Sequence, residues 1–95
     1  MTRTEWEDDI RNVFSTSISE ALFRMSQEKC FRVKTFQTNE RDGNKYEWAL
    51  EIETPTEYGG VDFSEFWLGT FGTRKDVVAF CREMGWKIKS VKPKQ

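Results

Sequence analysis

The stretch that most constrains the fold of this 95-residue chain runs from residue 46 to residue 54. Large apolar side chains alternate along it with acidic or small ones, and the apolar set is Tyr46, Trp48, Leu50 and Ile52. Such alternation is typical of a strand that buries one face and leaves the other in water. Pro55 ends the stretch, because proline cannot donate to the hydrogen bonds of a central strand. We therefore expect an antiparallel sheet with one solvated face.

Two weaker strand patterns flank this central strand. The first covers residues 30–37 and is joined to it by a polar hairpin loop, in which Asp42-Gly43 is the turn signal. The other covers residues 63–71, after a glycine-containing loop. Gly69 interrupts this last strand, which predicts either a β-bulge or a close approach of a packed helix.

Helical periodicity predicts an N-terminal helical layer. Residues 4–14 place four apolar side chains on one face, and Thr4 with Glu7 has the spacing of a capping box. A second apolar stripe continues to about Gln27, beginning at Ser17. It is either a second helix or the continuation of one helix that bends at the Ser/Thr cluster.

A further helix and a short strand are predicted near the end of the chain. Thr73 has the position of an N-cap with Asp76 as the acidic third helical residue, and Gly85 that of the residue that ends the helix. Residues 86–89 alternate again, which predicts a fourth strand. The predicted fold is a single α+β domain. It has a helical layer over residues 1–28, a sheet-plus-helix unit over 29–92 and a frayed tail over 93–95.

The residue types present argue against an enzyme. The chain has no His, so it lacks the commonest acid–base group near neutral pH and cannot form a Ser–His or Cys–His pair. Its two cysteines, Cys30 and Cys81, have no metal-binding spacing. We expect no catalytic residues, no metal and no cofactor. Without a long apolar run or a secretory leader pattern, a cytoplasmic setting without a membrane partner is expected.

The acidic residues concentrate on and after the central strand. No Lys or Arg occurs from residue 46 to residue 73, whereas six acids do: Glu47, Glu51, Glu53, Glu57, Asp62 and Glu65. We predict that these acids, with Trp67 beside them and Phe63 and Phe66 nearby, form a partner-binding surface. Such a surface suits a protein with a basic patch, including a nucleic-acid-processing enzyme. The alternative is a solvated face in which cross-strand pairs with Arg32 and Lys34 neutralise the acids.

Two segments of the predicted sheet carry a family signature, Trp48-Ala49-x-Glu51-Ile52 and Trp67-Leu68-Gly69-Thr70-Phe71-x-Thr73. Over about residues 30–82 they resemble the plant AP2/ERF DNA-binding domain. The resemblance implies a three-stranded sheet on one helix that reads duplex DNA through the sheet. Bases that could take this role are Arg32, Lys34, Arg41, Lys45, Lys87 and Lys89. The family's basic position before the first Trp is Glu47 here.

A second likeness covers about the same span. The pattern Phe71-x-Thr73-x-x-Asp76-x-Val78-x-Phe80-x-x-x-x-Gly85-Trp86 is similar to the end of a small accessory subunit of respiratory complex I. Both resemblances imply a strand–strand–helix layout. Since fold does not fix function, the charges decide the prediction. We expect a non-catalytic binding module, a small accessory or inhibitory protein of the kind phages encode, with AP2-like DNA binding as the alternative.

Overall fold

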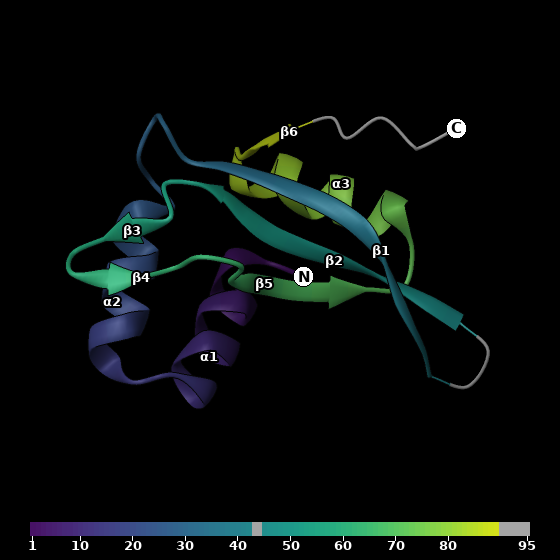
Figure 1. The fold of residues 1–95 in the computed structure, drawn as a ribbon, viewed down its shortest axis with the longest axis horizontal. Helices are drawn as coiled ribbons and strands as arrows, with labels where there is room; N and C mark the ends of the chain where they lie inside the picture. The colour runs from purple at the N-terminus through teal and green to yellow at the C-terminus, as the bar shows by residue number, and fades with distance from the viewer. Residues whose placement is uncertain (43–44, 90–95) are drawn as a thin grey trace.

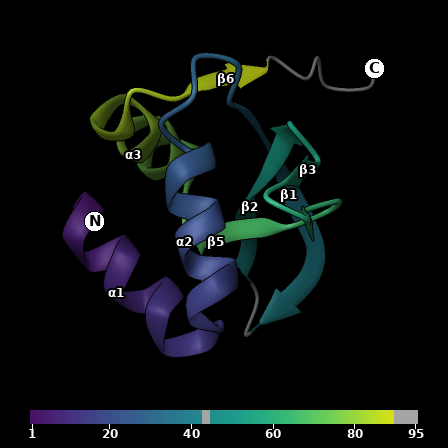
Figure 2. The ribbon, with the colours of Figure 1, turned by 90° about the vertical axis from the view of Figure 1, so that its left-hand side faces the viewer.

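Three helices and six strands make up residues 1–42 and 45–89, the part of the chain that the computed structural model describes. In order they are α1 (Arg3–Val13), α2 (Thr16–Met25), β1 (Arg32–Asp42), β2 (Lys45–Thr54), β3 (Glu57–Tyr58), β4 (Val61–Asp62), β5 (Trp67–Phe71), α3 (Arg74–Met84) and β6 (Lys87–Lys89). Four strands form one sheet in the order β5-β2-β1-β6, and β3 pairs with β4. The helices lie on one side of the four-stranded sheet, and its other side is uncovered (Figure 1, Figure 2). The predicted α+β class is confirmed.

The alternation of the central strand orients the whole sheet. On β2, Leu50 and Ile52 are buried against the helices, and Trp48 is half-buried on the same side. The antiparallel partner β1 places Val33 opposite Ile52 and so adds to the same buried layer. This side of the sheet therefore forms the core, as the sequence pattern predicts.

The predicted antiparallel three-stranded sheet is formed by β5, β2 and β1, and the predicted short fourth strand, β6, makes the sheet mixed. It runs parallel to β1, with Val33 beside Ile88. The reason is the connection through α3, which carries the chain back across the helical face before the next strand begins. The expected tail over residues 93–95 lies outside the described residues.

The helix starts differ in part from the predicted ones. The capping box of α1 is made by Thr2 and Glu5, and α2 is capped by Ser15. Both caps lie two residues before the predicted pairs, because Thr4 and Ser17 are already in the first turn, where they cannot cap. Thr73 caps α3 as predicted. The Ser/Thr cluster separates two helices, so the alternative of one bent helix is wrong.

The centre of the core is a group of aromatic rings around Trp6. Its ring lies within 5.2–6.4 Å of the rings of Phe23, Phe80 and Trp86, measured between centroids. The Trp6 indole N–H donates to the carbonyl oxygen of Leu68 at 3.1 Å. This contact ties α1 to the edge strand β5, so one side chain links both helical and sheet layers.

The segment between β2 and β5 is more structured than the predicted loop and strand. Strands β3 and β4 form a small hairpin, and Tyr58 on it donates to a carboxylate oxygen of Glu28 at 3.0 Å. Phe63, expected at the start of a strand, lies before β5, which begins only at Trp67, and its side chain is fully buried. The register shifts between β2 and β5 next to Gly69, which confirms the predicted bulge.

Candidate functional site

The uncovered side of the four-stranded sheet, here called the open face, is the main candidate surface. Alternation and side-chain contacts assign to it Arg32, Lys34, Phe36, Glu47, Ala49, Glu51, Glu53, Trp67, Thr70, Lys87 and Lys89. The face thus combines two aromatic rings with charges of both signs. Phe63 and Phe66, which were expected beside the acids, do not belong to it. Both face the core, where the Phe66 ring lies 5.0 Å from that of Phe14.

Trp67 is the prominent apolar group of the open face. It is 45% exposed, whereas every other aromatic side chain that the structure describes is buried or half-buried. Its indole N–H donates to Glu51 Oε1 at 3.1 Å, and its ring meets the Phe36 ring edge-on at 5.8 Å. The bulge positions it there, because Trp67 pairs with Glu51 whereas Gly69 already pairs with Leu50. Trp67 is therefore held in a defined orientation on the open face.

The acids of β2 are joined to lysines of the neighbouring strands. Lys34 Nζ lies 3.0 Å from Glu51 and 3.5 Å from Glu53, and Lys89 Nζ lies 3.0 Å from Glu53. Hydrogen bonding to Glu51 raises the pKa of Lys34, and hydrogen bonding to Lys89 lowers that of Glu53. These contacts form a continuous chain of alternating charge across β2, β1 and β6.

The ion pairs neutralise two of the three acids in the predicted row on β2, Glu51 and Glu53. Glu51 is only 7% exposed, and its two oxygens are used by Lys34 and Trp67. Glu53 contacts two lysines. Glu47 is exposed, and its carboxylate has no ion-pair partner among the described side chains. Glu47 is thus the acid of this row that remains available to a partner.

The ion pairs predict a pH dependence of stability at acid pH. Because the pKa of Glu53 is lower in the folded chain than its ordinary value of 4.5, its pairing stabilises the fold above that pH. The contribution is lost as the pH falls through the folded-state pKa. We expect the difference in unfolding free energy between the wild type and Glu53→Gln to be larger at pH 7 than at pH 3. Urea denaturation at both pH values measures it, and a difference that does not change with pH would contradict the pairing.

The remaining predicted acids lie outside the strands of the four-stranded sheet. Glu57 and Asp62 face each other across the β3–β4 hairpin, which packs against α2. Hydrogen bonding by the hydroxyl and then by the backbone N–H of Ser64 lowers the pKa of Asp62. Glu65 is in the turn before β5 with a φ of 56°. Glu57 and Asp62 therefore belong to the small hairpin and not to the four-stranded sheet, whereas Glu65 directly precedes Phe66, whose carbonyl oxygen accepts from the backbone N–H of Ile52 on β2.

Four bases of the predicted nucleic-acid set share the open face. The β1–β6 register places Arg32 beside Lys87 and Lys34 beside Lys89. Lys34 and Lys89 are in the ion pairs above, whereas Arg32 and Lys87 are exposed and unpaired among the described side chains. The side chains of Arg41 and Lys45 lie outside the described part. The open face is therefore basic toward its β6 edge.

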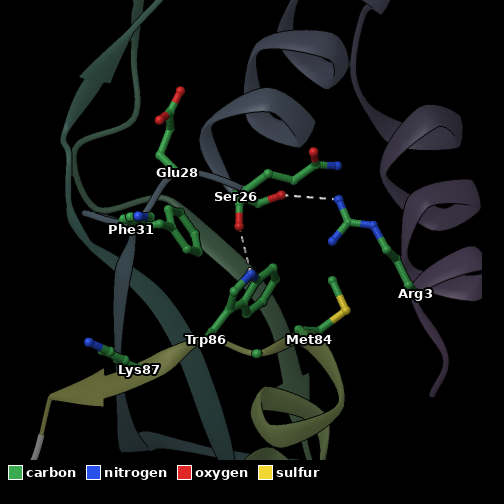
Figure 3. Close-up of a pocket in the computed structure, with 10 residues that line it drawn as sticks. Arg3, Ser26, Glu28, Phe31, Met84, Trp86 and Lys87 are labelled. Carbon is green, nitrogen blue, oxygen red and sulfur yellow. Dashed lines mark hydrogen bonds between the residues drawn. The ribbon is translucent and has the colours of Figure 1, made fainter.

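A pocket of about 490 Å³ opens where α2 and α3 end, over Phe31, Met84 and Trp86 (Figure 3). On its wall, the Trp86 indole N–H donates to the carbonyl oxygen of Ser26 at 3.0 Å. Arg3 donates to the Ser26 hydroxyl at 3.2 Å and pairs with Glu7. These polar groups are used to join α1, α2 and α3.

Comparisons of this chain with family models, curated proteins and solved structures find no match. The AP2/ERF and complex I likenesses therefore stay predictions. Among the described residues, no group of three or more potential ligands is placed to hold a metal ion. No helix in the described part is long and apolar enough to cross a membrane.

Proposed function

We propose that this chain is a non-catalytic protein-binding module that receives its partner on the open face, with Trp67 as the anchor. In this role it is a small accessory or inhibitory protein. The exposed free thiol of Cys30 suits a reducing compartment, so we place the module in the cytoplasm.

The observation that carries this proposal is the fixed, exposed position of Trp67. Tryptophan is enriched at sites that dominate binding energy, because it offers a large apolar area at little loss of conformational entropy. Here the hydrogen bond to Glu51 and the contact with Phe36 already restrict its rotamers. A partner therefore gains the area of the indole ring without the cost of ordering it.

The partner that this surface fits has an apolar pocket for Trp67 and a basic group opposite Glu47. Glu47 and Trp67 belong to the half of the open face formed by β2 and β5. The other acids of β2 contribute little to attraction, since lysines of the same chain already neutralise them. The partner therefore needs a basic group only opposite Glu47, and not a basic patch along the whole of β2.

A second candidate function is binding of duplex DNA through the same face. The observation that favours it is the in-register placement of Arg32 beside Lys87 and of Lys34 beside Lys89. Cations on a sheet surface can contact successive phosphates. Against it, Glu47, Glu51 and Glu53 lie on the strand next to β1, where a phosphate backbone would meet their charge.

Two parallel measurements separate the candidates. The first measurement captures a partner protein from a cell extract on the immobilised chain. For the protein-binding module, we expect nuclease treatment of the extract to leave the amount of captured protein unchanged, and Glu47→Gln to reduce that amount severalfold. For DNA binding, a duplex would shift at low salt and lose affinity steeply between about 50 and 200 mM salt. The double variant Arg32→Gln with Lys87→Gln would abolish that shift. A duplex shift with this behaviour would overturn the protein-binding proposal.

A further inference from the structure

We infer that a groove between α3, the end of β5 and the start of α1 binds a partner segment with a bulky apolar side chain flanked by Lys or Arg. The groove has a volume of about 640 Å³. It is lined by residues of α3, of the end of β5 and of the segment that precedes α1. Figure 1 shows that α3 begins just after the end of β5 and runs in the opposite direction. Of the residues that line the groove, Thr70 alone is also assigned to the open face, and neither Trp67 nor Glu47 lines it, so the inference does not depend on the function proposed above.

One face of α3 forms a wall of the groove. Asp76, Ala79, Phe80 and Glu83 line it at helical positions i, i+3, i+4 and i+7. The opposite face of the helix, which includes Val77 and Cys81, is buried in the core. The groove-lining face therefore carries its two carboxylates without a role in core packing.

The floor of the groove is aromatic. Phe71 at the end of β5 is half-buried and its ring lies 5.4 Å from that of Phe80. Ala79 beside them is exposed, so no large side chain of α3 fills the space above the rings. A bulky apolar side chain from a partner would thus contact mainly the half-buried Phe71 ring, which packs against the buried Phe80 ring, itself only 3% exposed.

Charge selects which apolar segment fits. Asp76 and Glu83 are both exposed, and neither forms an ion pair with a described side chain. They are seven positions apart, which is about 10 Å along a helix. Two carboxylates at this spacing favour Lys or Arg on each side of the apolar residue, and they repel acidic segments and phosphate backbones.

Gly72 offers a way to close the groove without disturbing the fold. A Cβ added there meets no atom within 4 Å, and its backbone is not in the left-handed region. Gly72→Leu should therefore fold and fill the space. Glu83→Lys should also fold, because Glu83 is exposed in the last turn of α3, where a cation is favoured by the helix dipole.

The test uses capped tripeptides and NMR amide shifts of the whole chain. We expect Lys-Phe-Lys to cause saturable shifts at Phe71, Gly72, Ala79 and Phe80, with at least tenfold weaker binding of Glu-Phe-Glu and of Lys-Gly-Lys. Glu83→Lys and Gly72→Leu should each weaken Lys-Phe-Lys at least tenfold. Glu20→Lys, which changes net charge equally on α2 away from the groove, should not.

Several results would overturn the inference. One is equal binding of the basic and acidic peptides, and another is the absence of saturable shifts at millimolar peptide. Shifts confined to the open face would place the peptide elsewhere. Concentration-dependent shifts of the groove amides without peptide would assign the groove to a second copy of the chain. None of these results bears on capture through Trp67, so failure here is distinguishable from failure of the proposed function.

Discussion

Replacing Trp6 with alanine is expected to lower the free energy of unfolding by about 3–5 kcal/mol, the range observed for buried tryptophan or phenylalanine. Trp6 is only 2% exposed and contacts the rings of Phe23, Phe80 and Trp86. Its loss leaves a cavity at the centre of the core and removes the donor to the Leu68 carbonyl. A domain of this size is stabilised by roughly 5–15 kcal/mol, so the variant would retain little stability.

Urea denaturation followed by far-ultraviolet circular dichroism measures this effect. Val13→Ala is the matched control, since Val13 belongs to the same helix and is 73% exposed. Its unfolding free energy should stay within about 0.5 kcal/mol of the wild type. Similar losses in the two variants would mean that Trp6 does not hold α1 to the core.

Replacing Trp67 with alanine is expected to weaken partner binding at least thirtyfold, or about 2 kcal/mol, the threshold of a dominant contact residue. The expected cause is the loss of the indole area that enters the partner. Stability should change much less than in Trp6→Ala, because Trp67 is 45% exposed and Glu51 keeps its contact with Lys34. Quantitative capture by the immobilised chain, compared with its circular dichroism spectrum, separates the two effects.

Trp67→Phe and Val13→Ala are the controls for this measurement. Phenylalanine keeps an apolar ring and the contact with Phe36 but loses the hydrogen bond to Glu51, so we expect an intermediate loss. Val13→Ala removes an exposed apolar side chain from the helical side and should leave capture unchanged. A folded Trp67→Ala that retains the partner as well as the wild type does would rule out the anchor.

The elements that the sequence predicts best are those set by local patterns. The alternation through Trp48, Leu50 and Ile52 predicts β2 and its buried side, because a period of two needs no knowledge of neighbouring strands. The cap at Thr73 and the left-handed Gly85 likewise follow from local backbone chemistry. The caps predicted at Thr4 and Ser17 are two residues too late, because several hydroxyl residues there offer competing caps.

The candidate site could be predicted only in part, because it depends on contacts distant in the sequence. The acidic row on β2 is visible in the sequence, and so is the option of pairing with Lys34. The contact of Lys89 with Glu53 requires β6 to lie parallel beside β1, which the alternation of β6 alone does not specify. The outward position of Trp67 depends on a bulge whose register is set by β2.

The groove on α3 shows the same limit. The apolar stripe of α3 predicts which side enters the core, but not what borders the other side. Asp76 and Glu83 border a groove only because the end of β5 brings Phe71 beside Phe80. A search for acidic and small residues at helical spacing opposite the apolar stripe would have found them as candidates.

Photo-crosslinking from position 67 tests the central claim most directly. The reactive residue p-benzoylphenylalanine replaces Trp67 in one variant and Val13 in another, so that one probe lies on the open face and the other on the helical side. The proposed interface predicts that the partner protein is attached at position 67 and not at position 13. Attachment at position 13 alone, or attachment of nucleic acid in place of protein at position 67, would contradict it.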